Sequence, residues 1–188
     1  SGANSDALIA NPLALNMYLL GYNSRKKLVS VNQAVKENLR TYLGQYRMIT
    51  DAINLKDAFV INIGVKFNIL TKPTANKNEV LTRAIEEVKT FFEVDRWQIN
   101  QPIVLADLVY RLSLVDGVSG VVPPKEDNLA SNPIIITNKY KTADGYSGNL
   151  YDIDSATKNG VIYPSLDPSI FELKFPASDI EGRVVGDY

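Results

Sequence analysis

The chain has 188 residues, of which 45% are hydrophobic and 22% charged, and its formal net charge is −1. This composition is typical of a globular domain with a real core, and the near-zero charge argues against broad, sequence-independent binding to nucleic acid. Cys and His are both absent, which excludes disulfides, thiolate zinc sites, Cys–His nucleophiles and the Ser–His–Asp triad. No apolar run reaches the roughly 18–20 residues that a membrane-spanning helix needs, so no membrane partner is expected.

The charge is divided unevenly along the chain. Residues 1–94 carry 12 basic and 8 acidic groups, a net +4, whereas residues 95–188 carry 8 and 13, a net −5. Such an asymmetry favours head-to-tail contact between copies, although most uneven charge distributions have no functional meaning.

The N-terminal part of the sequence predicts a strand, a helix and a second strand. Residues 1–10, which open with Ser1-Gly2 instead of Met, are interpreted as a cleavage scar and leader. Residues 13–20 are mostly apolar and predict a strand that ends in a turn. Ser30 and Gln33 have the spacing of a capping box. The helix after them stops at Gly44 and has an apolar stripe formed by Val31, Val35, Leu39 and Tyr42. A short strand is expected at residues 52–55.

The clearest signal lies in residues 59–69, where apolar and other residues alternate. The odd positions are Phe59, Ile61, Ile63, Val65, Phe67 and Ile69. The even positions include Asn62, Gly64, Lys66 and Asn68. Alternation over this length predicts a long strand with one dry face, bent or bulged at Gly64.

Two helices and a strand are expected next. Asn78 can cap a helix whose inner stripe is Leu81, Ala84, Ile85, Val88 and Phe92. Pro102 is tolerated in a first turn, so residues 100–102 are expected to open a third helix, buried through Leu105, Leu108, Val109 and Leu112. A turn at Asp116-Gly117 then leads into a strand at residues 118–122. The order β-α-β-β-α-α-β predicts an α+β core domain over residues 11–124, arranged as a ferredoxin-like split βαβ fold.

Residues 125–188 form a predicted extended, β-rich C-terminal arm. A strand is expected at residues 133–140, and three later prolines oppose compact helices. Phe171, Leu173 and Phe175 alternate with polar residues like a strand with one buried face. Two placements remain open: the arm adds an edge strand to its own sheet, or it packs on a neighbouring subunit. The candidate interface residues in the second case are Tyr163, Ile170, Phe171, Leu173, Phe175 and Ile180.

The residues indicate no catalytic, cofactor or metal site. Asp152 and Asp154 are too few ligands for Ca²⁺ and lie in no EF-hand loop. The sequence has neither a Walker loop nor a G-x-G-x-x-G motif. Glycoside cleavage needs only two carboxylates at the right separation, but no pair stands out among 21 acidic residues.

Several segments nevertheless resemble one protein family. They are residues 11–22, Lys27-Leu28, residues 47–53, 62–65, 97–102, 116–118, 159–168 and 171–176. Together they are similar to the C-terminal part of the baseplate wedge protein of T-even-type contractile-tailed phages, which belongs to the baseplate-J-like group. The resemblance covers roughly residues 11–185 and includes no catalytic signature.

The resemblance implies a structural virion protein of the tail baseplate, assembled in the host cytoplasm, where a cysteine-free chain fits a reducing environment. The expected partners are other copies, which link neighbouring wedges into a ring around the hub, and other wedge proteins. No enzyme activity, small-molecule substrate or nucleic acid is expected. The alternatives are a surface-recognition or adhesin-type binding module, indicated by exposed aromatic clusters lining a groove, and a hydrolase with two facing carboxylates in a deep pocket.

Overall fold

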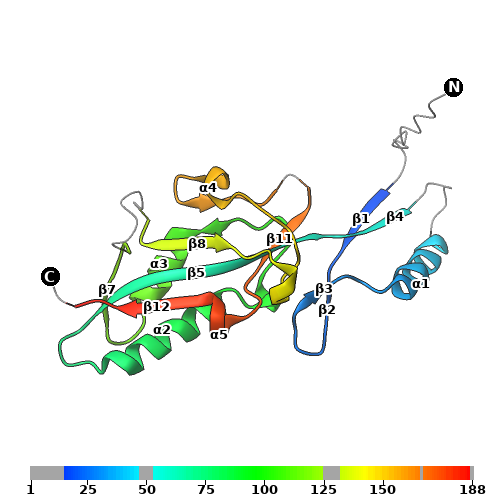
Figure 1. The fold of residues 1–188 in the computed structure, drawn as a ribbon. Helices are drawn as coiled ribbons and strands as arrows, with labels where there is room; N and C mark the ends of the chain where they lie inside the picture. The colour runs from blue at the N-terminus through cyan, green and yellow to red at the C-terminus, as the bar shows by residue number, and fades with distance from the viewer. Residues whose placement is uncertain (1–14, 47–52, 125–131, 166, 187–188) are drawn as a thin grey trace.

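The centre of the fold is a long strand, β5 (Phe59–Thr71), which pairs with other strands on both of its edges (Figure 1). The computed structural model describes residues 15–46, 53–124, 132–165 and 167–186. Along one edge of β5 run β11 (Ser169–Glu172) and β12 (Ile180–Val184), both parallel to it. Along the other edge run β8 (Ile134–Asn138) and β7 (Val118–Val122), both antiparallel. The main sheet therefore combines strands from both halves of the chain.

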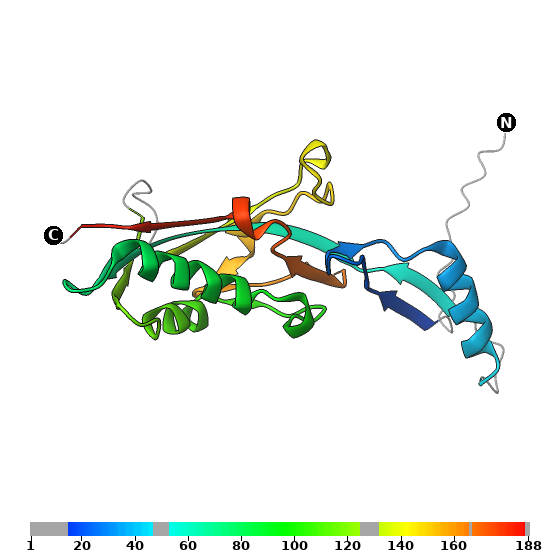
Figure 2. The same cartoon turned by 90° about the horizontal axis from the view of Figure 1, so that it is seen from below.

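The odd residues of β5 form the apolar face of this sheet, as the alternation predicts. This face packs on α2 (Lys77–Phe91) and α3 (Leu105–Ser113), which lie side by side (Figure 2). Five of the predicted positions are buried: Ile61, Ile63, Val65, Phe67 and Ile69. The helices contribute Val80, Ala84, Val88, Leu105, Leu108 and Leu112 to the same core. Each large apolar side chain buried here stabilises the fold by about 1.5–3 kcal/mol.

The other face of β5 is also largely covered, which the alternation does not predict. Asn62 and Gly64 are both buried. The expected bulge at Gly64 is wrong, because Gly64 pairs regularly with Thr137. The irregularity lies between Leu70 and Thr71 instead. A Cβ at Gly64 would lie 2.8 Å from the Lys139 side chain and 2.9 Å from the Thr137 hydroxyl, so both side chains would have to shift.

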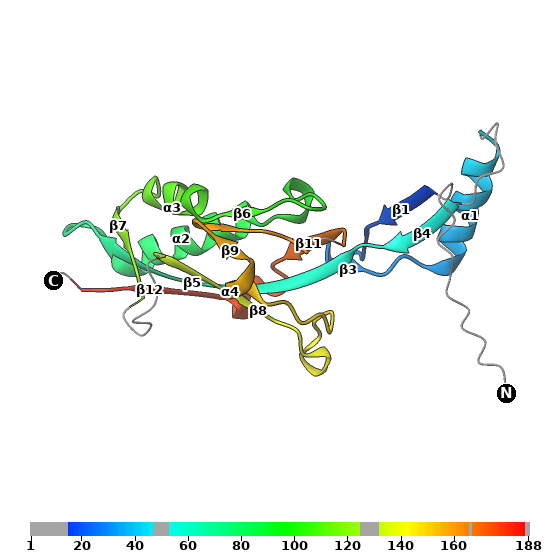
Figure 3. The ribbon, with the colours of Figure 1, turned by 90° about the horizontal axis from the view of Figure 1, so that it is seen from above.

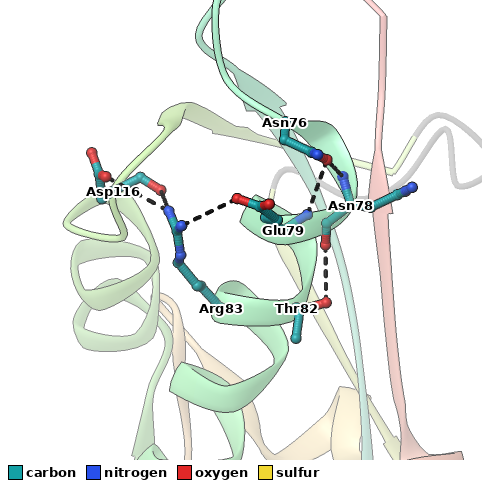
Figure 4. Close-up of polar contacts among 6 residues, drawn as sticks. All are labelled: Asn76, Asn78, Glu79, Thr82, Arg83 and Asp116. Atoms are coloured by element: carbon teal, nitrogen blue, oxygen red, sulfur yellow. Dashed lines mark hydrogen bonds and ion pairs between the residues drawn. The ribbon is translucent and has the colours of Figure 1, made fainter.

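The N-terminus of α2 is fixed by its cap and by one arginine (Figure 4). The cap is Asn76 and not the expected Asn78; its Oδ1 accepts hydrogen bonds from the backbone N–H groups of Asn78 and Glu79. Arg83 then reaches from α2 to Asp116, donating to its backbone oxygen at 3.3 Å, and to Glu79 one turn earlier at 3.5 Å. The Asn76 bonds satisfy backbone donors at the helix start, and the Arg83 bond to Asp116 ties α2 to the turn before β7.

The third helix begins later than expected. Residues 103–104 form the short strand β6 (Ile103–Val104), and α3 starts directly after it. β6 pairs with β10 (Val161–Ile162), which forms a hairpin with β9 (Thr157–Lys158) through Asn159 and Gly160, both with positive φ. Positive φ at both positions is typical of a type I′ hairpin turn.

The C-terminal segment is more than an extended arm. The strand predicted at residues 133–140 is confirmed as β8. Short helical turns follow, which the proline spacing does not predict: η2 (Thr142–Asp144), α4 (Ile153–Ala156) and α5 (Pro176–Asp179). A further turn, η1 (Val94–Arg96), lies between α2 and β6. Because β8, β11 and β12 all pair with β5, this segment shares one sheet with the predicted core domain.

The remaining elements project from the body as an N-terminal lobe, defined here as residues 15–46 and 53–57 (Figures 1 and 3). It contains a parallel two-stranded ribbon, a hairpin and one helix: β1 (Leu15–Leu19) with β4 (Ile53–Asp57), β2 (Gly21–Tyr22) with β3 (Leu28–Val29), and α1 (Gln33–Gly44). The chain is α+β, as expected. The ferredoxin-like arrangement is not confirmed, because β1 and β4 pair with each other and not with β5.

Candidate assembly surface

The residues predicted for an intersubunit contact lie mostly inside their own chain. Ile170, Phe171, Leu173 and Ile180 are buried, and Phe175 is half-buried. β11 and β12, which carry three of them, hydrogen-bond to β5. Only Tyr163 is exposed. The arm therefore packs on its own sheet, which was the other placement left open by the sequence, and these buried side chains are not available as a surface.

The N-terminal lobe has the opposite character, because it exposes apolar side chains and has almost no core. Leu28 is the one residue of the lobe that is buried within the described chain. Exposed large apolar residues gather there: Leu15, Tyr22, Val29, Val35, Tyr42 and Tyr46. The lobe also presents a two-stranded ribbon, and ribbons of two strands are at best marginally stable in water without further packing.

The outer face of α1 is the most apolar part of this lobe. Val35 and Tyr42 are seven residues apart on the helix, which places them on one face, and Tyr46 follows in the turn directly after α1. They are 54%, 56% and 70% exposed. The two tyrosine rings lie 5.0 Å apart. We call these three residues the α1 face. The capping box predicted at Ser30 is wrong, since the side chain of Asn32 caps α1 by accepting from the Ala34 N–H.

A second face of α1 holds the helix on its ribbon. Lys36 forms an ion pair with Asp57 at the end of β4, with 2.8 Å between Nζ and Oδ2. Asp57 also accepts a hydrogen bond from the Val31 N–H at 3.0 Å. Burial alone would raise the pKa of Asp57, but the bonds from Lys36 and Val31 and the Lys36 charge hold it below its ordinary value. The α1 face is thus presented by a helix whose start is fixed.

The lobe is joined to the body through a buried carboxylate. Glu172 of β11 accepts from the Leu28 N–H of β3 at 2.6 Å and from the Asn62 amide of β5 at 2.8 Å. Asn62 in turn accepts from the Ser147 N–H at 2.8 Å. Burial raises the pKa of Glu172, opposed by these two hydrogen bonds and by the charges of Lys174 and Lys27.

A cleft of about 500 Å³ at this joint is lined by both Glu172 and Asp57. Each of these carboxylates is already held by donors of the chain itself: Leu28 and Asn62 for Glu172, Lys36 and Val31 for Asp57. The cleft therefore does not supply the free pair of facing carboxylates that hydrolysis of a glycoside needs.

A larger groove of about 590 Å³ lies on the helical side of the body, between α2, η1 and α3. Its aromatic lining consists of Phe91, Trp97 and Tyr110, with Leu114 beside them. Tyr110 and Leu114 are 64% and 65% exposed. The indole N–H of Trp97 is buried and has no acceptor within the described residues. The sequence did not single out this groove, because helical spacing marks only the inner stripe of α3.

The groove also contains paired charges. Arg111 lies 5.6 Å above the Phe91 ring and 3.2 Å from Glu87. Arg96 pairs with Glu93 at 3.4 Å. Asp107, Tyr110 and Leu114 also line the groove, and Tyr110 and Leu114 are its exposed large apolar residues.

The Asp152 and Asp154 pair has a structural explanation. Asp152 is the N-cap of α4 and accepts from the Ser155 N–H at 3.1 Å and from its hydroxyl at 2.6 Å. Those bonds lower the pKa of Asp152. Among the residues that the structure describes, no group of three or more acidic side chains is arranged to hold a metal ion.

The sequence matches no protein-family model, and no curated protein is significantly similar to it. Over the described ranges, no helix has the length and apolar character needed to cross a membrane.

Proposed function

We propose that this chain is a structural assembly module that binds other copies of itself through its N-terminal lobe, as a component of a phage tail baseplate wedge. The observation that carries the proposal is the α1 face: three large apolar side chains, more than half exposed, on a lobe with almost no core. Contiguous exposed apolar surface is typical of protein–protein contact sites. The assignment to a baseplate wedge is supported by the resemblance of the sequence segments to that family.

Self-association can be tested by sedimentation over a range of concentrations. Wild-type protein should form dimers or larger species at high micromolar concentration. Tyr42→Glu/Tyr46→Glu, which places two charges on the α1 face, should weaken association by at least tenfold, because each charge would have to be desolvated.

The matched control is Tyr140→Glu/Leu150→Glu. Both residues are exposed large apolar residues outside the lobe, and the change in net charge is the same. This control should associate like wild type. Equal losses in the two double variants would show that added charge, and not the α1 face, is responsible. A wild-type protein that stays monomeric throughout would refute the proposed function.

The second candidate function is a surface-recognition module of a phage tail, and one observation favours it. The groove between α2 and α3 is lined by aromatic side chains, as expected for such a module. Trp97 is the single tryptophan of the chain, so its fluorescence reports on this groove alone. A saturable change on titration with bacterial surface oligosaccharides, at protein concentrations where no self-association occurs, would favour recognition over assembly.

A further inference from the structure

We propose that the α1 face of one copy docks in the groove between α2 and α3 of the next copy, so that the chains join head to tail. This inference rests on the proposed function and names the two surfaces that would carry it. A helix with an apolar face bound in a groove is a recurrent mode of recognition.

The groove supplies what such a helix needs. Its rim residues, Tyr110 and Leu114, are about two-thirds exposed, and covering a large apolar side chain is worth about 1.5–3 kcal/mol. Trp97 also lines the groove, and its indole N–H is buried.

Charge selects this pairing over contact between two lobes. The described residues of the lobe contain 6 basic and 2 acidic groups, a net +4. The described residues of the body contain 12 basic and 14 acidic groups, a net −2. A lobe that meets a second lobe brings like charges together, whereas a lobe that meets a body brings opposite charges together.

The two surfaces cannot meet within one copy. α1 lies at the outer end of the lobe, and α2 and α3 lie on the body, well apart from it in all three views (Figures 1–3). A contact between two different surfaces of identical chains is heterologous, and it closes into a ring or continues as a filament.

A mixing experiment tests this geometry. The first variant is Tyr42→Glu/Tyr46→Glu, which blocks the α1 face. The second is Tyr110→Glu/Leu114→Glu, which blocks the groove. All four side chains are more than half exposed, so both variants should fold, as circular dichroism can verify. Leu114→Ser, which adds no charge, is a milder groove variant in case the double substitution unfolds α3.

Each double variant alone should sediment as a monomer at concentrations where wild type associates. An equimolar mixture should form a 1:1 dimer and nothing larger, because it contains a single intact pair of surfaces. Trp97 emission should change in the mixture and in neither component alone.

Two results would overturn the head-to-tail contact while the proposed function stands: a groove variant that associates like wild type, or a mixture that stays monomeric. Wild-type protein that is monomeric at every concentration would refute both proposals.

Discussion

Removal of residues 160–188 should abolish the fold, because β11 and β12 form the whole parallel edge of the main sheet. The deletion removes five apolar side chains that are at most 7% exposed: Ile162, Ile170, Phe171, Leu173 and Ile180. At about 1.5–3 kcal/mol each, their burial contributes roughly 8–15 kcal/mol. A whole domain is stable by about 5–15 kcal/mol. The loss is therefore comparable to the whole stability of the domain.

The assay is urea unfolding followed by circular dichroism, with gel filtration to detect aggregation. Wild type should unfold cooperatively, and the truncated chain should be insoluble or unfold without a transition. The single substitution Phe171→Ala provides a graded version and should cost about 3–5 kcal/mol. A truncated chain that unfolds cooperatively with a wild-type denaturant dependence would refute this reasoning, and would show that residues 160–188 serve a neighbour instead.

Three further predictions concern single residues. Burial raises the pKa of Glu172 in the folded state, so the folded protein binds the carboxyl proton more tightly than the unfolded chain does. The stability gained from this proton is present in full below the unfolded pKa of Glu172, about 4.3. It is lost as the pH rises through the pKa of Glu172 in the folded protein. From pH 4 to pH 7, the unfolding free energy of wild type should therefore fall relative to that of Glu172→Gln. A difference between the two proteins that does not change with pH would contradict the burial argument. Burial, and to a smaller extent the hydrogen bond to Asp179, raises the pKa of Tyr146 to about 12. Tyr146→Phe removes the 2.5 Å hydrogen bond that the Tyr146 hydroxyl donates to the buried Asp179. This substitution should lower the unfolding free energy by about 1–3 kcal/mol. Gly64→Ala should cost about 1–3 kcal/mol through overpacking, whereas Gly44→Ala, where a Cβ meets nothing within 4 Å, should cost nothing measurable by chemical denaturation.

The local structure was predictable where a period was clean. Five of the six odd residues of β5 and three of the four predicted α3 positions are buried, and Phe59 and Val109 are half-buried. An apolar stripe at a regular spacing predicts a buried face. The strand at residues 133–140 was predictable for the same reason. These signals are local, and each depends on residues a few positions apart.

What could not be predicted depends on partners far away in the sequence. Glu172 alternates like a solvent-facing residue, but it is buried because Asn62, 110 positions earlier, and the Leu28 N–H both bond to it. The same distance separates Phe59 from its parallel partner Ser169. No local pattern reports such pairings, so the place of the arm stayed open, and the predicted ferredoxin-like strand order is not confirmed. The α1 stripe looked like an ordinary inner face, and only its exposure distinguishes it as a surface.

The parallel edge of β5 also sets an order of events during synthesis. Ser169 is made 110 residues after the Phe59 that it pairs with, which is about 5–20 s at ordinary elongation rates. For that interval one edge of the longest strand lacks its final partners, and pairing over such a separation in sequence is slow. An open strand edge pairs readily with other chains. Copies that meet before β12 is in place therefore risk the wrong contact, so completion of β12 decides when a chain is ready to bind others.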